Sequence, residues 1–499
     1  MGVTKKSAKK VKFNFFSTKT LLISILLIGS FLRFYNFPYR YGLGEETVRD
    51  AVIGIEGARE LQAPLTGAFS SLGPFTFGPL YGYQLILSYL IFPFNYSPWV
   101  YLSLISVIYI FIIFKIGNLL SGKTFGLMLA LLAAFSPAQV ISATHLTSHN
   151  NTNIFAILAI WIFLRILLKG GSYWWGFALG ISLGFGISLH YQMAGLLILP
   201  LLILIVKFKK YLYFISSACG LFVTFLPLIF FELNNHWFNT RNIIDYFLYG
   251  RTRIYVPNRW LFYVRDFWPS FWADSLGVST NFAIVIILLF IGVIIWLFKK
   301  KKITFPLTLL LIAFLINFIM LRYYWGQRFF GYLNYLRPFV FIFTGYTLFY
   351  LAKIRIVKYF AVLLLFLILA MSIPRNLYQM EKDGLSVEIY KEVDQLDNKY
   401  PDKKFTVYGC SNFYRGGYNA KLFSLIFVLD SRDKLDKSGV KLGVESEDCS
   451  SLSYPKIKET EIIDFNKASE GAILKAGWKV NSFKSIYELN ARWWFREQP

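Results

Sequence analysis

Long apolar runs separated by short polar segments dominate this chain. Uncharged stretches of about 20 residues recur as far as about residue 373, and this is the length that a helix needs to cross a bilayer. We predict about eleven such spans, at about 20–36, 97–119, 124–143, 153–169, 174–190, 192–207, 211–232, 279–298, 303–321, 334–351 and 355–373. The pattern therefore indicates an α-helical polytopic membrane protein.

Basic residues cluster between the apolar runs, at 5–12, 207–210, 299–302 and 353–358. A net charge of +24 would suggest nucleic-acid binding in a soluble protein, but this chain is 56% hydrophobic. Cations at span ends are typical of cytoplasmic anchors. We therefore expect no nucleic-acid partner, and a multi-pass protein of the cell membrane. Its basic N-terminus (1–19) is then cytoplasmic, and segments 37–96 and 233–278 are outer loops.

The composition changes at about residue 375 to that of a soluble domain. An odd number of spans places this region, 375–499, on the extracytoplasmic side. Short apolar runs predict strands at Phe405–Tyr408, Leu422–Leu429, Val440–Val444 and Trp478–Phe483, and a helical pattern covers Ser386–Leu396. We predict a small α/β domain. Cys410 and Cys449 both fall in it, and the sequence leaves open whether they form a disulfide.

Acidic residues gather directly after the first span, where Glu45, Glu46, Arg49 and Asp50 follow one another. The segment 46–61 has the pattern of an interfacial helix, and 79–94 predicts a second apolar helix too short to cross the bilayer. Two carboxylates in a first helical turn can simply complement the helix dipole. At a membrane–water boundary they also suit a reaction between a lipid-borne anion and a hydroxyl.

Ionisable residues lie at the ends of the predicted spans, as Arg33, His190 and Arg322 do at outer ends. None lies at a span midpoint, where a secondary transporter would place its site. This distribution favours chemistry at the outer surface. A lipid or polysaccharide transporter and a non-catalytic membrane scaffold stay as alternatives.

Several short motifs follow one another on the predicted outer face. They are Glu46-Thr-Val-Arg49-Asp50-Ala51, Phe77-Gly-Pro-Leu-Tyr-Gly-Tyr83, Ser136-Pro137, His149-Asn-Asn151, Leu189-His190-Tyr191-Gln192 and Arg328-Phe-Phe-Gly-Tyr332-Leu-Asn-Tyr-Leu-Arg337-Pro338. In order and location they resemble the GT-C type membrane glycosyltransferases. They resemble most closely the protein mannosyltransferase and aminoarabinose transferase superfamily, which uses polyprenyl-phosphate sugars. The resemblance covers roughly residues 15–375, so we expect a GT-C-like catalytic domain at 20–374.

The resemblance implies transfer of a sugar from a polyprenyl-phosphate donor, itself a membrane lipid, to an acceptor hydroxyl, with inversion. It makes Glu46 the general base, with Glu45 as the rival. Arg49 lies one helical turn from Glu46, so both side chains can face one cavity. Aminoarabinose transferases carry a phosphate-binding Lys where this chain has Gly78. We therefore expect Arg49, Arg328 or Arg337 to bind the donor phosphate. The alternative role of these arginines is to anchor the chain at the membrane interface.

Further residues are expected to contact the donor or the acceptor. They are Asp50, Asn151, His190, Gln192 and Tyr332. His145 and His149 are one turn apart if helical and could hold a divalent cation. Because no third ligand is fixed by spacing, they are also compatible with ordinary polar loop residues, and we expect no certain metal or cofactor. The sugar, the acceptor and the oligomeric state stay open.

Overall fold

The structure is a computed structural model of the chain. It describes residues 17–70, 73–249, 259–324, 328–381, 385–409, 418–444, 454–456 and 462–482. Cys410, Cys449 and most of the basic N-terminus lie outside these residues, so the structure does not address the disulfide question.

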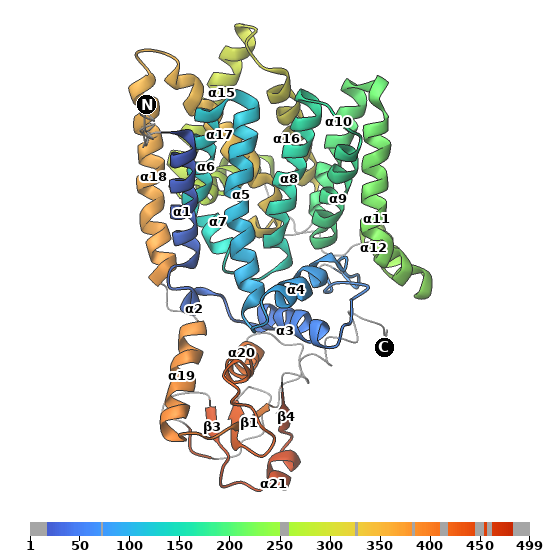
Figure 1. The fold of residues 1–499 in the computed structure, drawn as a ribbon, viewed down its shortest axis with the longest axis vertical. Helices are drawn as coiled ribbons and strands as arrows, with labels where there is room; N and C mark the ends of the chain where they lie inside the picture. The colour runs from blue at the N-terminus through green and yellow to red at the C-terminus, as the bar shows by residue number, and fades with distance from the viewer. Residues whose placement is uncertain are drawn as a thin grey trace, which may run out of the picture.

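Long helices form a bundle, and a small sheet-containing domain lies at one end of it (Figure 1). The bundle contains α1 (Thr18–Phe34), α5 (Ser97–Ser121), α6 (Lys123–Phe135), α7 (Pro137–Ser142), α8 (Ser148–Leu168), α9 (Trp174–Leu189), η1 (Tyr191–Leu197), α10 (Ile198–Val206), η2 (Phe208–Lys210), α11 (Leu212–Asn234), α15 (Thr280–Lys299), α16 (Phe305–Tyr323), η4 (Phe330–Leu336), α17 (Arg337–Ala352) and α18 (Lys358–Glu381). Within the described residues, six helices are long and apolar enough to cross a membrane, in α5, α8, α11, α15, α16 and α18. The chain is a multi-pass membrane protein. The number of eleven spans and their sidedness stay predictions.

One predicted span, 124–143, is not a continuous helix. Helix α6 ends at Phe135, and α7 begins at Pro137. Proline has no N–H to continue a helix and favours extended backbone in the residue before it. Ser136 is extended there, and its hydroxyl accepts a hydrogen bond from the Gln139 N–H at 3.3 Å, which caps α7.

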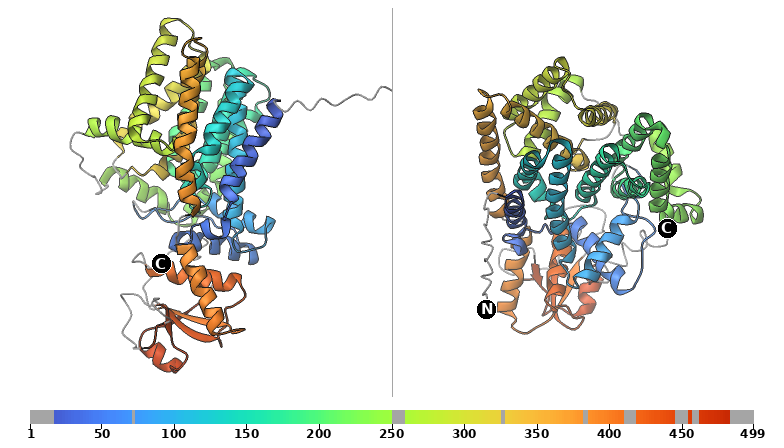
Figure 2. Two further views of the ribbon diagram at one scale, coloured as in Figure 1. Left: turned by 90° about the vertical axis from the view of Figure 1, so that its left-hand side faces the viewer. Right: turned by 45° about the horizontal axis from the view of Figure 1, so that its top comes forward.

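Three short helices follow the first span. They are α2 (Phe37–Arg40), α3 (Glu45–Arg59) and α4 (Leu80–Ile91), and the last two confirm the helices predicted at 46–61 and 79–94. Figure 1 and Figure 2 place α3 and α4 between the bundle and the C-terminal domain. We call this end of the bundle the domain-proximal end.

The described parts of the segment 233–278 are folded rather than a simple connector. They contain α12 (Phe238–Tyr249), α13 (Arg259–Phe262), the π-helix η3 (Tyr263–Phe267) and α14 (Trp268–Leu276). The carboxylate of Glu232 accepts hydrogen bonds from the N–H groups of Asn239 and Thr240 at 2.9 Å, at the start of α12. The Asn239 side chain in turn accepts the N–H of Thr76 at 2.8 Å. The start of α12 is therefore held against the segment 37–96.

The C-terminal region is a small α/β domain, as predicted. Its elements are α19 (Leu385–Lys399), β1 (Phe405–Gly409), α20 (Tyr418–Ser431), β2 (Val440–Val444), β3 (Ile462–Asp464), α21 (Glu470–Lys475) and β4 (Lys479–Asn481). The sheet has the order β3-β2-β1-β4, with β1 and β2 parallel and the other two pairs antiparallel.

The strand predicted at Leu422–Leu429 is wrong, because this segment lies in helix α20. Every residue from Leu422 to Leu429 is buried. A helix enclosed on all sides carries a continuous apolar run, and such a run has no periodicity that separates it from a buried strand. The neighbours that enclose α20 include α19, β1 and α3.

The C-terminal domain shares a hydrophobic core with the segment 37–96 and the start of α5. Phe427 of α20 packs edge-to-face on Trp99 of α5, with ring centroids 5.4 Å apart. Ser386 of α19 donates its hydroxyl to the carbonyl of Tyr41 at 2.5 Å and accepts the N–H of Leu43 at 3.2 Å. Through these contacts the domain fixes the segment that leads into α3.

Candidate active site

Helix α3 carries the predicted acidic motif on the domain-proximal end. Glu46 is exposed, Glu45 and Arg49 are half-buried, and Asp50 is buried. Arg49 Nη2 lies 2.7 Å from Asp50 Oδ1, and Arg49 Nε donates to the same oxygen at 2.9 Å. The guanidinium is therefore already engaged by a carboxylate, while Glu46 presents its carboxylate toward open space.

Burial controls the protonation of the neighbouring acids. It raises the pKa of Glu45, an effect that Arg49 opposes. Burial also raises the pKa of Asp50 to about 6, although the ion pair with Arg49 acts in the opposite direction. The buried hydroxyl of Tyr81 in α4 lies close to Asp50 but completes no hydrogen bond of normal geometry.

Histidines and aromatic rings continue the site from α3 into the bundle. Glu46 lies near enough to His145 to counter the lowering of the His145 pKa that burial causes. His149, the second residue of α8, meets the ring of Tyr332 edge-to-face at 5.4 Å. His190 stacks on the other side of the cluster, with its ring centroid 4.5 Å from that of Tyr332 and 5.3 Å from that of Phe77. The structure thus brings four predicted residues together: Glu46, His149, His190 and Tyr332.

The divalent-cation hypothesis for His145 and His149 finds no third ligand in the described part of the chain. No group of three or more His, Cys, Asp or Glu side chains lies close enough there to hold a metal ion. His149 instead shares a hydrogen bond of 3.2 Å between its Nε2 and the Thr147 hydroxyl.

Three arginines form a second cluster, which the sequence analysis identified only at Arg328. Burial lowers the pKa of Arg328, and the nearby charges of Arg259 and Arg322 lower it further. Arg328 stacks over Tyr263 at 5.0 Å, and Arg322 over Trp260 at 4.6 Å. We call Arg259, Arg322 and Arg328 the arginine cluster.

The arginine cluster has unused hydrogen-bonding capacity. Arg328 donates to the backbone carbonyls of Leu321 and Arg322 at 3.1 Å. The buried Nε atoms of Arg259 and Arg322 have no hydrogen-bond partner within the described residues. No ion pair joins the cluster to a described carboxylate. Guanidinium groups held this way suit an anion with several oxygens.

Tyr324 connects the arginine cluster to the aromatic part of the site. Burial raises the pKa of its hydroxyl to about 12, and the charge of Arg328 opposes this. Gln192 and Tyr332 also lie beside that hydroxyl. Gln192 therefore joins the site, where the buried Oε1 of its side chain has no partner among the described residues.

Arg337 is placed differently from Arg328. Its side chain is buried, and each nitrogen faces a group of its own chain: Nε donates to Asn334 Oδ1 at 2.6 Å, Nη1 donates to Ser275 Oγ at 2.9 Å, and Nη2 pairs with Asp274 at 2.8 Å. Such a guanidinium ties η4 to α14 rather than facing a ligand. Its predicted role in donor binding has no support in this geometry.

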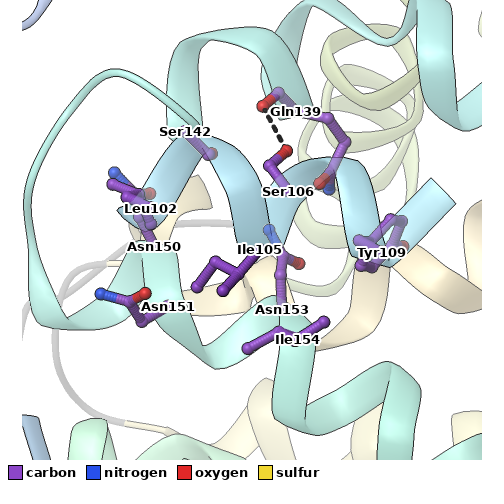
Figure 3. Close-up of a pocket in the computed structure, with 10 residues that line it drawn as sticks. All are labelled: Leu102, Ile105, Ser106, Tyr109, Gln139, Ser142, Asn150, Asn151, Asn153 and Ile154. Carbon is purple, nitrogen blue, oxygen red and sulfur yellow. Dashed lines mark hydrogen bonds between the residues drawn. The ribbon is translucent and has the colours of Figure 1, made fainter. Parts of the chain in front are cut away.

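Asn151 also lies apart from the histidines. It lines a cavity between α5, α7 and α8 together with Asn153, Tyr109 and Gln139 (Figure 3). The cavity has a volume of about 20 Å³, which is room for about one water molecule. One buried polar atom of each of these four side chains has no hydrogen-bond partner in the described part of the protein. The neighbouring Asn150 instead accepts a hydrogen bond from Asn334 at 2.8 Å, which links α8 to η4.

Comparisons with known proteins agree with this architecture. Residues 76–231 match the profile of the family described as dolichyl-phosphate-mannose-protein mannosyltransferase. The crystal structure of ArnT from Cupriavidus metallidurans in the apo state superposes with a TM-score of 0.55 over 86% of each chain, at 13% identity. The chain has a GT-C fold.

Two further structures bear lipid phosphates. ArnT from Cupriavidus metallidurans bound to undecaprenyl phosphate gives a TM-score of 0.53 at 13% identity, over 84% of this chain and 86% of that one. The archaeal oligosaccharyltransferase AglB from Archaeoglobus fulgidus, in complex with an inhibitory peptide and a dolichol-phosphate, gives 0.48 at 16% identity, over 78% and 59%. No curated protein sequence matches the chain significantly.

Proposed function

We propose that this protein is a membrane glycosyltransferase that moves a sugar from a polyprenyl-phosphate carrier to an acceptor hydroxyl. The GT-C fold and the match over residues 76–231 support the reaction class. One observation carries the assignment of the site. Glu46 lies near His145 and Arg328 lies near Tyr324, and both of these neighbours adjoin the ring cluster of His149, His190 and Tyr332.

In this proposal Glu46 is the general base. The acceptor hydroxyl attacks C1 of the sugar as Glu46 takes its proton, and the bond from C1 to the carrier phosphate breaks with inversion. Arg49 is held by Asp50, so Glu46 keeps its own carboxylate available. Glu45 is half-buried and is the weaker candidate.

The leaving phosphate is assigned to the arginine cluster rather than to Arg337. Charge develops on the phosphate oxygens as the sugar leaves, and fixed donors aimed at that charge stabilise the transition state. Arg328 was already proposed from the sequence to bind the phosphate, and we add Arg259 and Arg322 to this role. Arg49 stays a candidate for the part of the donor nearest α3.

The first experiment compares Glu46→Gln with Glu45→Gln in purified enzyme, supplied with a panel of polyprenyl-phosphate sugars. Release of polyprenyl phosphate is the readout. We expect Glu46→Gln to abolish transfer and to leave carrier binding intact, because the amide keeps the shape but cannot take a proton. Glu45→Gln should be milder. An active Glu46→Gln enzyme together with an inactive Glu45→Gln enzyme would reverse the assignment.

The second experiment tests the phosphate site. Removing a donor aimed at developing charge commonly costs on the order of 3 kcal/mol, or about a hundredfold in rate, so we expect that loss for Arg328→Ala and a smaller one for Arg328→Lys. Arg265→Ala is the control, because Arg265 lies on η3 with Tyr263, over which Arg328 stacks, but is exposed and paired with Asp266. Equal activity of Arg328→Ala and the control would make Arg328 an interfacial anchor.

We also propose that the site and the C-terminal domain face the extracytoplasmic side, which follows from the basic clusters at the other span ends. Single cysteines at Ser70 and Ser438, in a background without native cysteines, test this with an impermeant thiol reagent. Labelling of intact cells at both positions is expected. Labelling of either position only after lysis contradicts the topology.

A further inference from the structure

A groove on the lipid-facing surface lies apart from the candidate active site, between α15 and α17. It has a volume of about 400 Å³, within the range of about 300–1,000 Å³ typical of ligand pockets. Its lining is apolar or aromatic throughout. The lining residues are Val285, Leu288, Leu289, Gly292, Val293, Trp296, Tyr350, Leu351 and Ile354.

The floor of the groove depends on Gly292. A Cβ atom added at this position would meet nothing within 4 Å, so the space above the glycine is open. Trp296 lies one turn further along α15, and its ring meets that of Tyr350 at 6.5 Å. The groove thus has open space above Gly292 and an aromatic wall formed by Trp296 and Tyr350.

Cations surround that end of the groove. Lys299 and Lys300 follow Trp296 by one helical turn, and both are exposed. From α17, Lys353 places its ammonium 4.6 Å from the ring centroid of Tyr350, which itself lines the groove. Lys301, Lys302, Arg355 and Lys358 add further positive charge nearby in the chain.

No acidic residue lies close to these cations in the sequence. Residues 275–380 contain no Asp or Glu, and no described salt bridge involves the lysines at 299–302, 353 or 358. A bilayer offers one abundant ligand with a long apolar chain and an anionic head at the depth where spans end. That ligand is an anionic phospholipid.

We infer that the groove between α15 and α17 binds an anionic phospholipid, with one acyl chain against Gly292 and the phosphate at Lys299, Lys300 and Lys353. The site is separate from the proposed donor site, since α3 and the arginine cluster contribute no lining residue. The lipid joins α15 to α17, and α17 continues from η4, which carries Tyr332.

The test uses purified full-length protein in detergent and phosphatidylglycerol as the ligand. The readouts are the thermal unfolding temperature and the lipid retained in native mass spectrometry. We expect saturable stabilisation by phosphatidylglycerol and little by phosphatidylcholine with the same chains. Glycerol phosphate, which has the head without a chain, should have no effect.

Two variants distinguish lipid binding in the groove from nonspecific attraction of the lipid to surface charge. Gly292→Phe fills the groove and should weaken phosphatidylglycerol binding about tenfold, the effect of losing the burial of about two methylene groups. Ile291→Phe is the matched control, because Ile291 is exposed on the same helix but does not line the groove. Lys353→Gln should weaken binding about fivefold, as expected for one cation near a lipid surface.

Unchanged binding in Gly292→Phe, or an equal loss in Ile291→Phe, would overturn the inference. So would equal stabilisation by phosphatidylcholine. Displacement of phosphatidylglycerol by an equimolar amount of undecaprenyl phosphate would assign the groove to the carrier lipid instead. Gly292→Leu repeats the test with a smaller side chain if the Phe variant does not fold.

Discussion

The buried carboxyl group of Asp50 makes the stability of the protein depend on pH in a way that one substitution removes. Burial raises its pKa from 3.8 to about 6 in the folded protein. The folded state therefore binds this proton more tightly than the unfolded chain does. The resulting stabilisation is fully present below about pH 4 and is lost as the pH rises through about 6.

The size of the effect follows from the shift. A difference of about two pKa units corresponds to about 3 kcal/mol between the two ends of that pH range. Replacing Asp50 by Asn removes the titration. It also leaves Arg49, which now lies 2.7 Å from the carboxylate, without its ion-pair partner. The ion pair exists only while Asp50 is ionised, so its pH dependence is already contained in the pKa shift of Asp50. The slope of stability against pH is therefore the diagnostic quantity, not its level.

Thermal unfolding of purified protein between pH 4 and 7.5 measures that slope. We expect the unfolding temperature of wild type to fall relative to that of Asp50→Asn between about pH 4 and 6, and the two curves to run parallel above pH 6. Glu56→Gln is the control, since Glu56 is an acid on the same helix that pairs with Arg59. Parallel curves across the whole range would refute the argument that Asp50 is protonated near pH 6.

Three further substitutions test how the site is held. Gly78→Ala should lower the unfolding temperature, by about 1–3 kcal/mol of stability, because its Cβ would clash with the side chain and backbone of Ser188. Phe427→Ala removes the ring that packs on Trp99 and should cost about 3–5 kcal/mol, measured as faster proteolysis of the C-terminal domain. Ser386→Ala loses two hydrogen bonds and should lower kcat with little change in KM if the domain positions α3. A change in KM alone would contradict that role.

The contact at Gly78 also bears on the phosphate-binding lysine that the resemblance gives to aminoarabinose transferases at this place. Relatives carry a phosphate-binding Lys at this place, so a lysine here could be expected to supply the missing cation. In the structure, the Gly78 N–H donates to the Ser188 carbonyl at 2.9 Å, and no side chain fits between the two segments. Gly78→Lys should therefore fail to restore an Arg328→Ala enzyme, and the activity assay of the purified double variant measures this.

Much of the membrane architecture is predictable from hydropathy, because a bilayer forces every span to be a long apolar helix. The helices at 46–61 and 79–94 were predictable for a related reason, since their apolar residues recur at helical spacing. The break at Ser136 was not predicted, although Pro137 marks it. The apolar run at Leu422–Leu429 lacked such a signal, since tertiary packing alone distinguishes a buried helix from a buried strand there.

In the candidate site too, neighbours within one helix could be predicted from the sequence, whereas contacts between distant segments could not. Glu46, Arg49 and Asp50 lie on one helical turn, so the sequence predicts that they are neighbours. Arg328 and Arg337 are equally basic and only nine positions apart in the chain, and nothing local separates their roles. The structure separates them by their partners. Arg337 meets Asp274, Ser275 and Asn334, whereas Arg328 meets backbone carbonyls and two further arginines.

That contrast also explains why α14 matters to the site. Asp274 and Ser275 come from a segment some sixty positions before Arg337, and together they neutralise a charge that would otherwise be buried without compensation. The arginine cluster has no such carboxylate within the described residues, and its three side chains are half-buried, so water or an anion from outside the chain can balance their charge. A lipid phosphate arriving from the bilayer supplies that anion only while it is bound. In this proposal, binding of the donor phosphate also neutralises the positive charge of the arginine cluster. Arg328 rather than Arg337 is therefore the residue to substitute first.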